Sequence, residues 1–243
     1  MSPARPRVVM IGGVACDETL WDDTVAALGG IADCRPILPD GAGIDAMAAD
    51  VLANVAGPFA LVGHSMGGYV ALAIQRRAPD RVERLALIGS GSNVEQPAQR
   101  EARLALMDLV GSRGFDALID RLVPAMVAPE TRRDAAMMAR LEAMVRRAGA
   151  ERFLRQQTAV MERPEAHGAL ASIGVPVLIM AGGADRIVAP AFGEETARAI
   201  PGAAYRVLAR CGHIAPVERA EAVSALLRDW LLDRPLPSQE AIG

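Results

Sequence analysis

The chain has 243 residues, 51% of them hydrophobic, and a formal net charge of −3 at pH 7. This length suits one α/β domain with an insertion, and the weak, evenly spread charge gives no attraction to nucleic acid or to an anionic membrane. All 26 basic residues are arginine, which excludes Schiff-base chemistry and a lysine general base. We therefore expect a small-molecule substrate and neither a nucleic-acid nor a membrane partner.

The beginning of the chain carries a short apolar stretch that ends at Gly12 and Gly13. It is too brief for a signal peptide or a membrane span, so a cytoplasmic protein is expected. The three cysteines, Cys16, Cys34 and Cys211, are an odd number at irregular spacing. This pattern predicts neither a disulfide framework nor a metal site.

Apolar runs of strand length alternate along the chain with amphipathic or small-residue stretches. Such alternation is typical of a doubly wound, mainly parallel sheet with crossover helices. The predicted strands are residues 8–11, 34–38, 59–62, 85–88, 175–180 and 205–208. The predicted helices are residues 20–28, 44–55, 66–77, 192–200 and 216–232. We expect an α/β fold with a sheet of about six strands.

The alternation stops between residues 93 and 164, where the pattern is helical and no strand is evident. We interpret residues 93–164 as a helical cap inserted into a core formed by residues 1–92 and 165–243. Six of the eleven methionines lie in this cap, which suits either a deformable surface over a ligand cavity or ordinary helix packing. They are Met107, Met126, Met137, Met138, Met144 and Met161.

One predicted cap helix has two distinct faces. Met137, Leu141 and Met144 share the apolar face, and we take them, with Cys16, as candidate lining of a substrate pocket. The opposite face carries arginines every seven residues, at Arg133, Arg140 and Arg147. It is either a solvated surface or a docking face for an acidic carrier protein or an anionic substrate. The residues from Leu232 onward are Pro-rich and polar, and predict a frayed tail.

A nucleophile motif follows the predicted strand 59–62. Gly63 and Gly67 flank Ser65 in a G-x-S-x-G pattern, and a small-residue helical run follows at once. A nucleophilic serine must project from a tight strand-to-helix turn, and glycines on both sides let the backbone turn without a side-chain clash. The N-terminus of the helix then faces the negative charge that develops during attack. We predict that Ser65 is a nucleophile.

From the first strand to the last helix, the chain resembles the α/β-hydrolase superfamily, without the two leading strands of many relatives. The resemblance places a catalytic acid after the next-to-last strand and a histidine after the last one. Asp185, within Gly182-Gly183-Ala184-Asp185, and His213, within Cys211-Gly212-His213-Ile214, stand at these places. The implied triad is therefore Ser65, Asp185 and His213, in the family's chain order.

The resemblance also implies how these groups work. His213 would remove the proton of Ser65, and Asp185 would hold the imidazole in the required tautomer. The two other histidines fit less well, because His64 adjoins the nucleophile and His167 lies in the polar return from the cap. The implied oxyanion donors are the backbone N–H groups of Met66 and of Val14, although Gly12 stands where histidine is common in this loop.

We expect hydrolysis of a small carboxylic ester or lactone through an acyl-enzyme on Ser65, without a metal or an organic cofactor, by a monomer or a homodimer. The triad does not separate esters from lactones. Other reactions on this fold remain open, namely carbon–carbon bond hydrolysis, thioesterase action and cofactor-free perhydrolysis. A small-molecule receptor with slow turnover is the alternative outside enzymes.

Overall fold

The computed structural model of the protein describes residues 5–239, apart from the side chain of His167. Six strands form one sheet in the order β2-β1-β3-β4-β5-β6, and every neighbouring pair is parallel. The prediction of a six-stranded parallel sheet is confirmed. The strands are β1 (Arg7–Ile11), β2 (Asp33–Ile37), β3 (Phe59–His64), β4 (Val82–Ile88), β5 (Val177–Gly182) and β6 (Ala204–Leu208).

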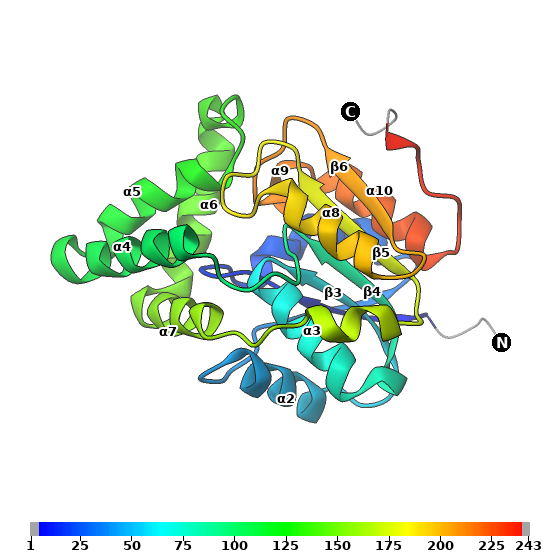
Figure 1. Ribbon diagram of the computed structural model, residues 1–243. Helices are drawn as coiled ribbons and strands as arrows, with labels where there is room; N and C mark the ends of the chain where they lie inside the picture. Colours follow the sequence, from blue (N-terminus) through cyan, green and yellow to red (C-terminus); the bar gives the residue numbers. More distant parts are fainter. Residues whose placement is uncertain (1–4, 240–243) are drawn as a thin grey trace.

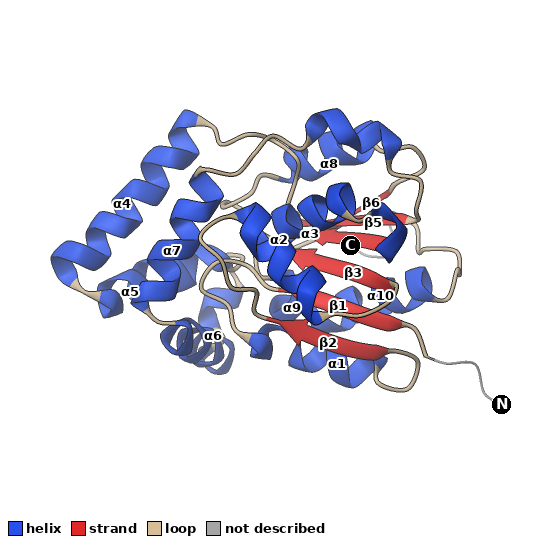
Figure 2. Cartoon of the chain, turned by 90° about the horizontal axis from the view of Figure 1, so that it is seen from below, coloured by secondary structure: helices blue, strands red, loops and turns tan. Residues whose placement is uncertain are grey.

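Helices cover both faces of the sheet (Figures 1 and 2). Successive residues of a strand point to opposite faces, so the sheet supplies two apolar layers. Val8 and Met10 of β1 face one helix group, α1 (Asp22–Leu28) and α10 (Ala220–Leu231). Val9 and Ile11 face the other group, which comprises α2 (Ile44–Asn54), α3 (Met66–Arg77) and α8 (Pro190–Ala199). The predicted helix 216–232 is divided, since α9 (Ala215–Glu218) ends just before α10 begins.

The order of the strands reverses direction between β1 and β3. The chain passes from β1 outward to β2 and then returns to β3 on the other side of β1. In open α/β sheets, ligands bind in the crevice beside such a switch point, at the carboxyl ends of the strands. The loop after β1 and the turn that carries Ser65 both begin there.

Four helices lie between β4 and β5 in the sequence, within the segment that we call the cap, residues 93–164. They are α4 (Pro97–Arg113), α5 (Phe115–Met126), α6 (Ala135–Ala148) and α7 (Ala150–Met161). They gather beyond the carboxyl ends of the strands (Figures 1 and 2). The short 3₁₀ segments η1 (Glu18–Trp21), η2 (Pro79–Arg81), η3 (Thr131–Arg133) and η4 (His167–Ser172) complete the described structure.

The prediction of a frayed tail is wrong for residues up to 239. The side chain of Gln239 donates to the carbonyl of Val207 and accepts its N–H, at 2.6 and 2.9 Å. Arg206 Nε also donates to the carbonyl of Pro237, at 2.7 Å. These bonds hold the tail along β6, and composition alone could not reveal them.

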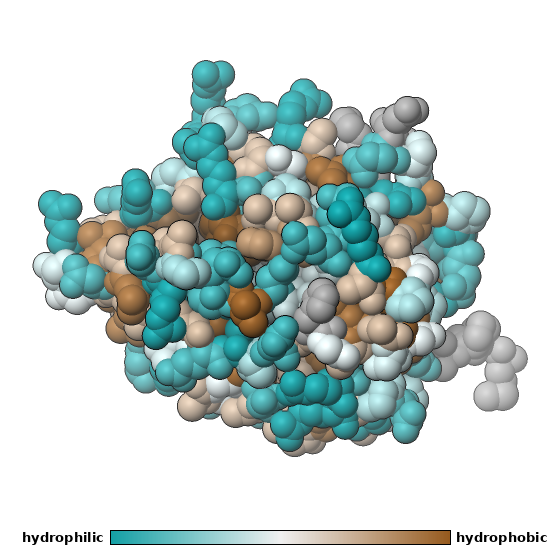
Figure 3. Space-filling view, viewed as in Figure 1, coloured by the Kyte–Doolittle hydropathy of each residue, from teal (hydrophilic) through white to brown (hydrophobic). Residues whose placement is uncertain are grey.

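The face of the molecule seen in Figure 3 mixes hydrophobic and hydrophilic residues, on the cap as on the core. The large apolar side chains that are exposed among residues 5–239 are Val94 and Leu104 in the cap and Leu232 in the core. Within the same range, no helix has both the length and the apolar character needed to cross a membrane.

Candidate active site

Ser65 occupies a strained turn between β3 and α3. Its φ is +54° and its ψ is −119°, a conformation that is costly for a residue with a side chain and that clusters at functional sites. The turn packs closely against β1, because a Cβ on Gly67 would lie 2.1 Å from the carbonyl oxygen of Ile11. A Cβ on Gly63 would likewise lie 2.3 Å from the carbonyl oxygen of Gly67, so close packing before and after the serine keeps it in this conformation.

Ser65, His213 and Asp185 lie in a hydrogen-bonded row. Ser65 Oγ is 2.8 Å from His213 Nε2, and His213 Nδ1 is 2.7 Å from Asp185 Oδ2. A carboxylate can only accept, so Nδ1 carries the proton and Nε2 is free to accept the serine hydroxyl proton. His213 is 4% exposed and Asp185 is 6% exposed, which keeps water from competing for these bonds. The structure thus brings together the three side chains that the family resemblance implies.

Asp185 is oriented by the turn that follows β5. Its Oδ1 accepts the backbone N–H groups of Ile187 and Val188, at 2.8 and 2.9 Å. The other carboxylate oxygen is therefore directed at His213. Such Asx-type bonds are also common in ordinary turns, but here they leave one oxygen for the imidazole.

His64 lies beside the row and has a different environment. Its Nε2 donates to the carbonyl of His213 at 2.9 Å, while its Nδ1 is buried and has no hydrogen-bond partner within residues 5–239. Burial, together with the nearby His213 ring, lowers the pKa of His64 to about 3. His64 is therefore neutral at physiological pH and supports the loop that carries His213.

The loop after β1 lies directly against Ser65. A Cβ on Gly13 would be 2.8 Å from Ser65 Cβ and 3.0 Å from His64 Nδ1. Val14, one of the two predicted oxyanion donors, follows in this loop, and Met66, the other, is the first residue of α3. Both predicted donors thus belong to segments that adjoin Ser65.

The loop that carries His213 is bound to the cap. The carbonyl of Met126, at the end of α5, accepts the N–H of His213 at 2.7 Å. Glu218, 7% exposed, accepts the N–H of Gly212 through Oε2 at 2.6 Å. Its Oε1 accepts the N–H of Ala128 at 2.8 Å and the hydroxyl of Thr131 at 2.5 Å. Glu218 therefore joins this loop to the cap segment after α5.

Two of the three arginines in the predicted row, Arg140 and Arg147, lie on α6 and form ion pairs with the core, whereas Arg133 ends η3. Arg147 Nε lies 2.7 Å from Asp17 Oδ2, and Arg140 Nη1 lies 2.6 Å from Asp23 Oδ2. Both acids lie between β1 and β2 in the sequence, Asp17 just before η1 and Asp23 in α1. Arg140 and Arg147 therefore connect the cap to the core. This role differs from both the solvated surface and the docking face predicted from the sequence.

Three of the four residues expected to line a substrate pocket are deeply buried, and Met137 is partly buried. Leu141, Met144 and Cys16 are at most 1% exposed and belong to one apolar cluster, against which Met137 packs. Burial raises the pKa of Cys16 to about 12, so its thiol is unreactive. The contribution of these four residues to substrate binding stays a prediction.

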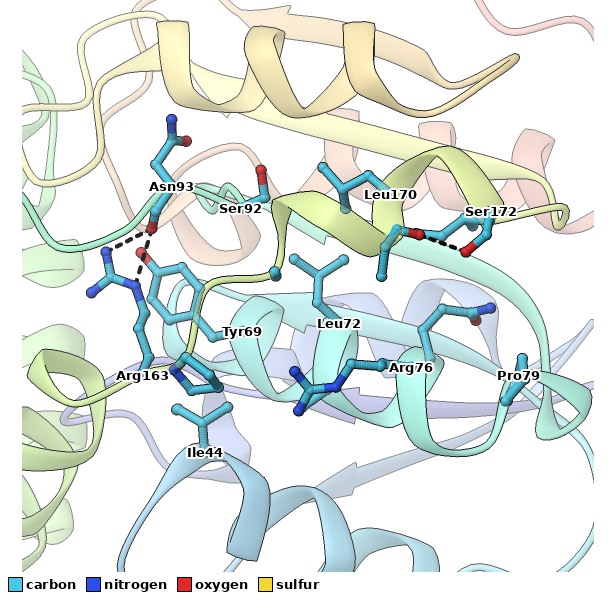
Figure 4. Close-up of a pocket in the computed structure, with 16 residues that line it drawn as sticks. Ile44, Tyr69, Leu72, Arg76, Pro79, Ser92, Asn93, Arg163, Leu170 and Ser172 are labelled. Atoms are coloured by element: carbon cyan, nitrogen blue, oxygen red, sulfur yellow. Dashed lines mark hydrogen bonds between the residues drawn. The ribbon is translucent and has the colours of Figure 1, made fainter.

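A cavity of about 130 Å³ lies between α3 and η4 (Figure 4). Its lining includes Tyr69, Leu72 and Leu170 but none of Ser65, Asp185 and His213. At one end, the guanidinium of Arg163 lies 4.5 Å from the centre of the Tyr69 ring and donates to the backbone carbonyl of Asn93. No group of three or more metal-ligating side chains occurs within residues 5–239.

Comparison with known proteins places this geometry in a family. A family model described as "Alpha/beta hydrolase family" matches residues 12–226. A pimeloyl-[acyl-carrier protein] methyl ester esterase of Neisseria meningitidis is 29% identical over 252 residues, which cover 97% of this chain and 80% of the relative. A 2-hydroxy-6-oxononadienedioate/2-hydroxy-6-oxononatrienedioate hydrolase of Paraburkholderia phymatum is 32% identical over 176 residues, 70% of this chain and 61% of the relative.

Two solved structures agree with this placement. An esterase of Thermogutta terrifontis superposes with a TM-score of 0.84 at 26% identity and covers 94% of this chain and 90% of its own. The enol-lactonase of Burkholderia xenovorans LB400 has the same TM-score and identity and covers 94% and 92%. Because the family model spans most of the sequence, including Ser65, Asp185 and His213, the chain belongs to the alpha/beta hydrolase family.

Proposed function

We propose that this protein hydrolyses a small carboxylic ester or lactone through an acyl-enzyme on Ser65. The observation that carries the proposal is the buried row in which Ser65 Oγ, the His213 ring and the Asp185 carboxylate are separated by 2.8 and 2.7 Å. These separations lie within the reach that a general base needs to remove a hydroxyl proton.

The first half of the reaction acylates the enzyme. Ser65 Oγ attacks the carbonyl carbon while His213 Nε2 takes the hydroxyl proton, and the carbonyl oxygen becomes an oxyanion. The N–H groups of Met66 and Val14 would stabilise that oxyanion. When the tetrahedral intermediate collapses, the alkoxide leaves and His213 returns the proton to it.

The second half releases the acid. A water molecule attacks the acyl carbon, His213 again takes the proton, and Ser65 leaves with that proton restored to it. Asp185 keeps the imidazole in one tautomer and stabilises the imidazolium in both halves. A lactone follows the same steps, except that its leaving alkoxide stays attached to the acyl chain throughout, and the product is a single hydroxy acid.

The comparisons favour ester cleavage over carbon–carbon cleavage. The methyl ester esterase matches 97% of this chain, cap included, whereas the carbon–carbon hydrolase relative matches 70%. The enol-lactonase supports a lactone as the second form of the same chemistry. Carbon–carbon bond hydrolysis is the second candidate, because that relative has the higher identity, 32%.

The test combines active-site labelling with a substrate panel. A fluorophosphonate should add mass to wild-type protein and none to Ser65→Ala, and the wild type should release p-nitrophenol from a short ester. Turnover by Ser65→Ala equal to that of the wild type would overturn the proposal, and absence of both labelling and turnover would favour a receptor. A panel of short esters, long esters, lactones, thioesters and a vinylogous diketone then assigns the bond type.

A further inference from the structure

We infer that Gln156, a residue of the cap, positions the loop after β1. This loop carries Val14 and Ala15, and we call it the oxyanion loop. This inference rests on the proposed acyl-enzyme function. Gln156 lies on α7, and its Oε1 accepts the backbone N–H of Ala15 at 3.0 Å, across 141 residues of sequence. Ala15 directly follows Val14, whose N–H is a predicted oxyanion donor. Gln156 therefore holds the peptide group next to the one that would stabilise the transition state.

The loop needs such a restraint because its backbone is strained at Ala15. The φ of Ala15 is +59°, in the left-handed region that residues with a Cβ avoid. A conformation of this kind persists only where surrounding contacts impose it. The hydrogen bond from Ala15 to Gln156 is a contact of this kind, and it fixes the orientation of the peptide that joins Val14 to Ala15.

Water is poorly placed to replace this bond. Ala15 is fully buried and Gln156 is 6% exposed. If the amide of Gln156 is removed, the Ala15 N–H keeps no acceptor in place, and a buried unpaired N–H is unfavourable. The loop would then move to find another partner, and Val14 would move with it.

The helix that carries Gln156 is itself held by a buried polar network. The neighbouring Gln157 accepts Arg103 Nη1 at 2.7 Å, and Arg103 Nε lies 2.7 Å from Glu95 Oε1. Glu95 also pairs with Arg163, which follows α7 and contacts Asn93 (Figure 4). The side chains of Glu95, Arg103 and Arg163 are 7%, 12% and 3% exposed. The pair between Glu95 and Arg163 does not involve Gln157, so it holds the end of α7 against the start of the cap, and Gln156 in its position, without the Gln157 contact.

Gln157 supplies a matched control. It lies on the same helix, is 3% exposed and is also a hydrogen-bond acceptor, but its partner is Arg103 rather than the oxyanion loop. Replacing either glutamine by methionine keeps the length of the side chain and removes its amide. A purely structural role for the polar face of α7 would make the two variants similar.

The experiment measures kcat, KM and melting temperature for Gln156→Met and Gln157→Met with a p-nitrophenyl ester. Gln156→Met should lower kcat about 10-fold or more with KM changed less than about 3-fold, because oxyanion contacts act mainly in the transition state. Gln157→Met should keep kcat within about 3-fold. The pH profile of kcat should keep its shape in both, because the contacts among Ser65, His213 and Asp185 are untouched.

The inference is overturned if Gln156→Met folds and keeps the wild-type kcat, or if both variants lose kcat equally. If Gln156→Met does not fold, Gln156→Asn replaces it, since that side chain keeps the amide but is one methylene too short to reach Ala15. The same fall in kcat is then expected. Ser65→Ala is measured in parallel: if that variant retains turnover, the proposed function fails, whereas an inactive Ser65→Ala with unaffected Gln156 variants overturns only the role of Gln156.

Discussion

The carbonyl oxygen of Met126 accepts the backbone N–H of His213 at 2.7 Å, so the residue that ends α5 directly holds the residue proposed as general base. The same carbonyl accepts the N–H of Ile214 at 3.1 Å. Gln156 also accepts the N–H of Ala15, so the cap binds both loops that flank Ser65, the one after β1 and the one that carries His213. Changes at these contacts should therefore affect turnover.

Gly212→Ala tests the contact between the histidine loop and the cap. A Cβ at Gly212 would lie 2.5 Å from the carbonyl carbon of Val127 and 2.7 Å from the nitrogen of Ala128, both backbone atoms that cannot rotate away. The loop must shift, and a displacement of about 1 Å at a catalytic group lowers kcat/KM about 100-fold. Gly174→Ala is the control, because a Cβ there would meet no atom within 4 Å. Equal activity of the two variants would show that the loop position is unimportant.

Glu218→Ala should destabilise the protein by about 3 kcal/mol, because it leaves two buried N–H groups and a partly buried hydroxyl without their acceptor. These donors are the N–H groups of Gly212 and Ala128 and the hydroxyl of Thr131. Urea unfolding at pH 7 measures the effect. Glu221→Ala, at an exposed position of α10, should change stability by less than about 0.5 kcal/mol. A loss as small as that at Glu218 would mean that water satisfies these donors.

Asp185→Asn should lower kcat about 1,000- to 10,000-fold with little change in fold. The asparagine can still accept from Ile187 and Val188, but its NH₂ group cannot accept the proton on His213 Nδ1. The imidazole would then adopt the other tautomer and present a protonated Nε2 to Ser65, which prevents proton removal. Steady-state kinetics beside a melting curve checks this, and near-wild-type turnover would show that another acid assists His213.

His64 should make the protein less stable in mild acid. Its pKa falls from 6.5 to about 3 on folding, so below pH 6.5 the unfolded chain binds a proton that the folded chain excludes. With respect to His64, the free energy of unfolding is therefore highest above pH 6.5, and it decreases as the pH falls toward 3. Between pH 7 and pH 4.5, His64→Gln should lose about 2 to 3 kcal/mol less stability than the wild type. Parallel pH curves for the two proteins would contradict this, and between pH 7 and 8.5 the difference between the two proteins should be constant.

Much of the architecture follows from local signals in the sequence. The apolar runs of β1, β3 and β5 have strand length and no polar interruption, and turn residues bound them, so the parallel sheet could be predicted. Gly63 and Gly67 around Ser65 mark the elbow, because only glycine tolerates its close packing. Asp185 and His213 needed the family resemblance, because an isolated aspartate after a strand is also a common turn residue.

The residues that organise the site from a distance carry no comparable signal. Gln156 and Glu218 resemble many polar residues on amphipathic helices, and their partners Ala15 and Ala128 are 141 and 90 residues away. Their roles arise only when the cap packs on the core. The ion pair between Arg147 and Asp17 could not be predicted for the same reason, since a repeating arginine face is equally typical of a helix surface that contacts only solvent.

The two outer strands of the sheet bear on self-association. Gln239 occupies both the N–H and the C=O of Val207, so at this point β6 presents no free backbone groups to a strand of another molecule. On the opposite border, β2 contains Pro36, which has no N–H to share, and carries the exposed charges of Asp33 and Arg35. Both edge strands are thus poor templates for fibrous aggregation. The interior of the sheet can therefore be strongly apolar without making the folded protein prone to aggregate.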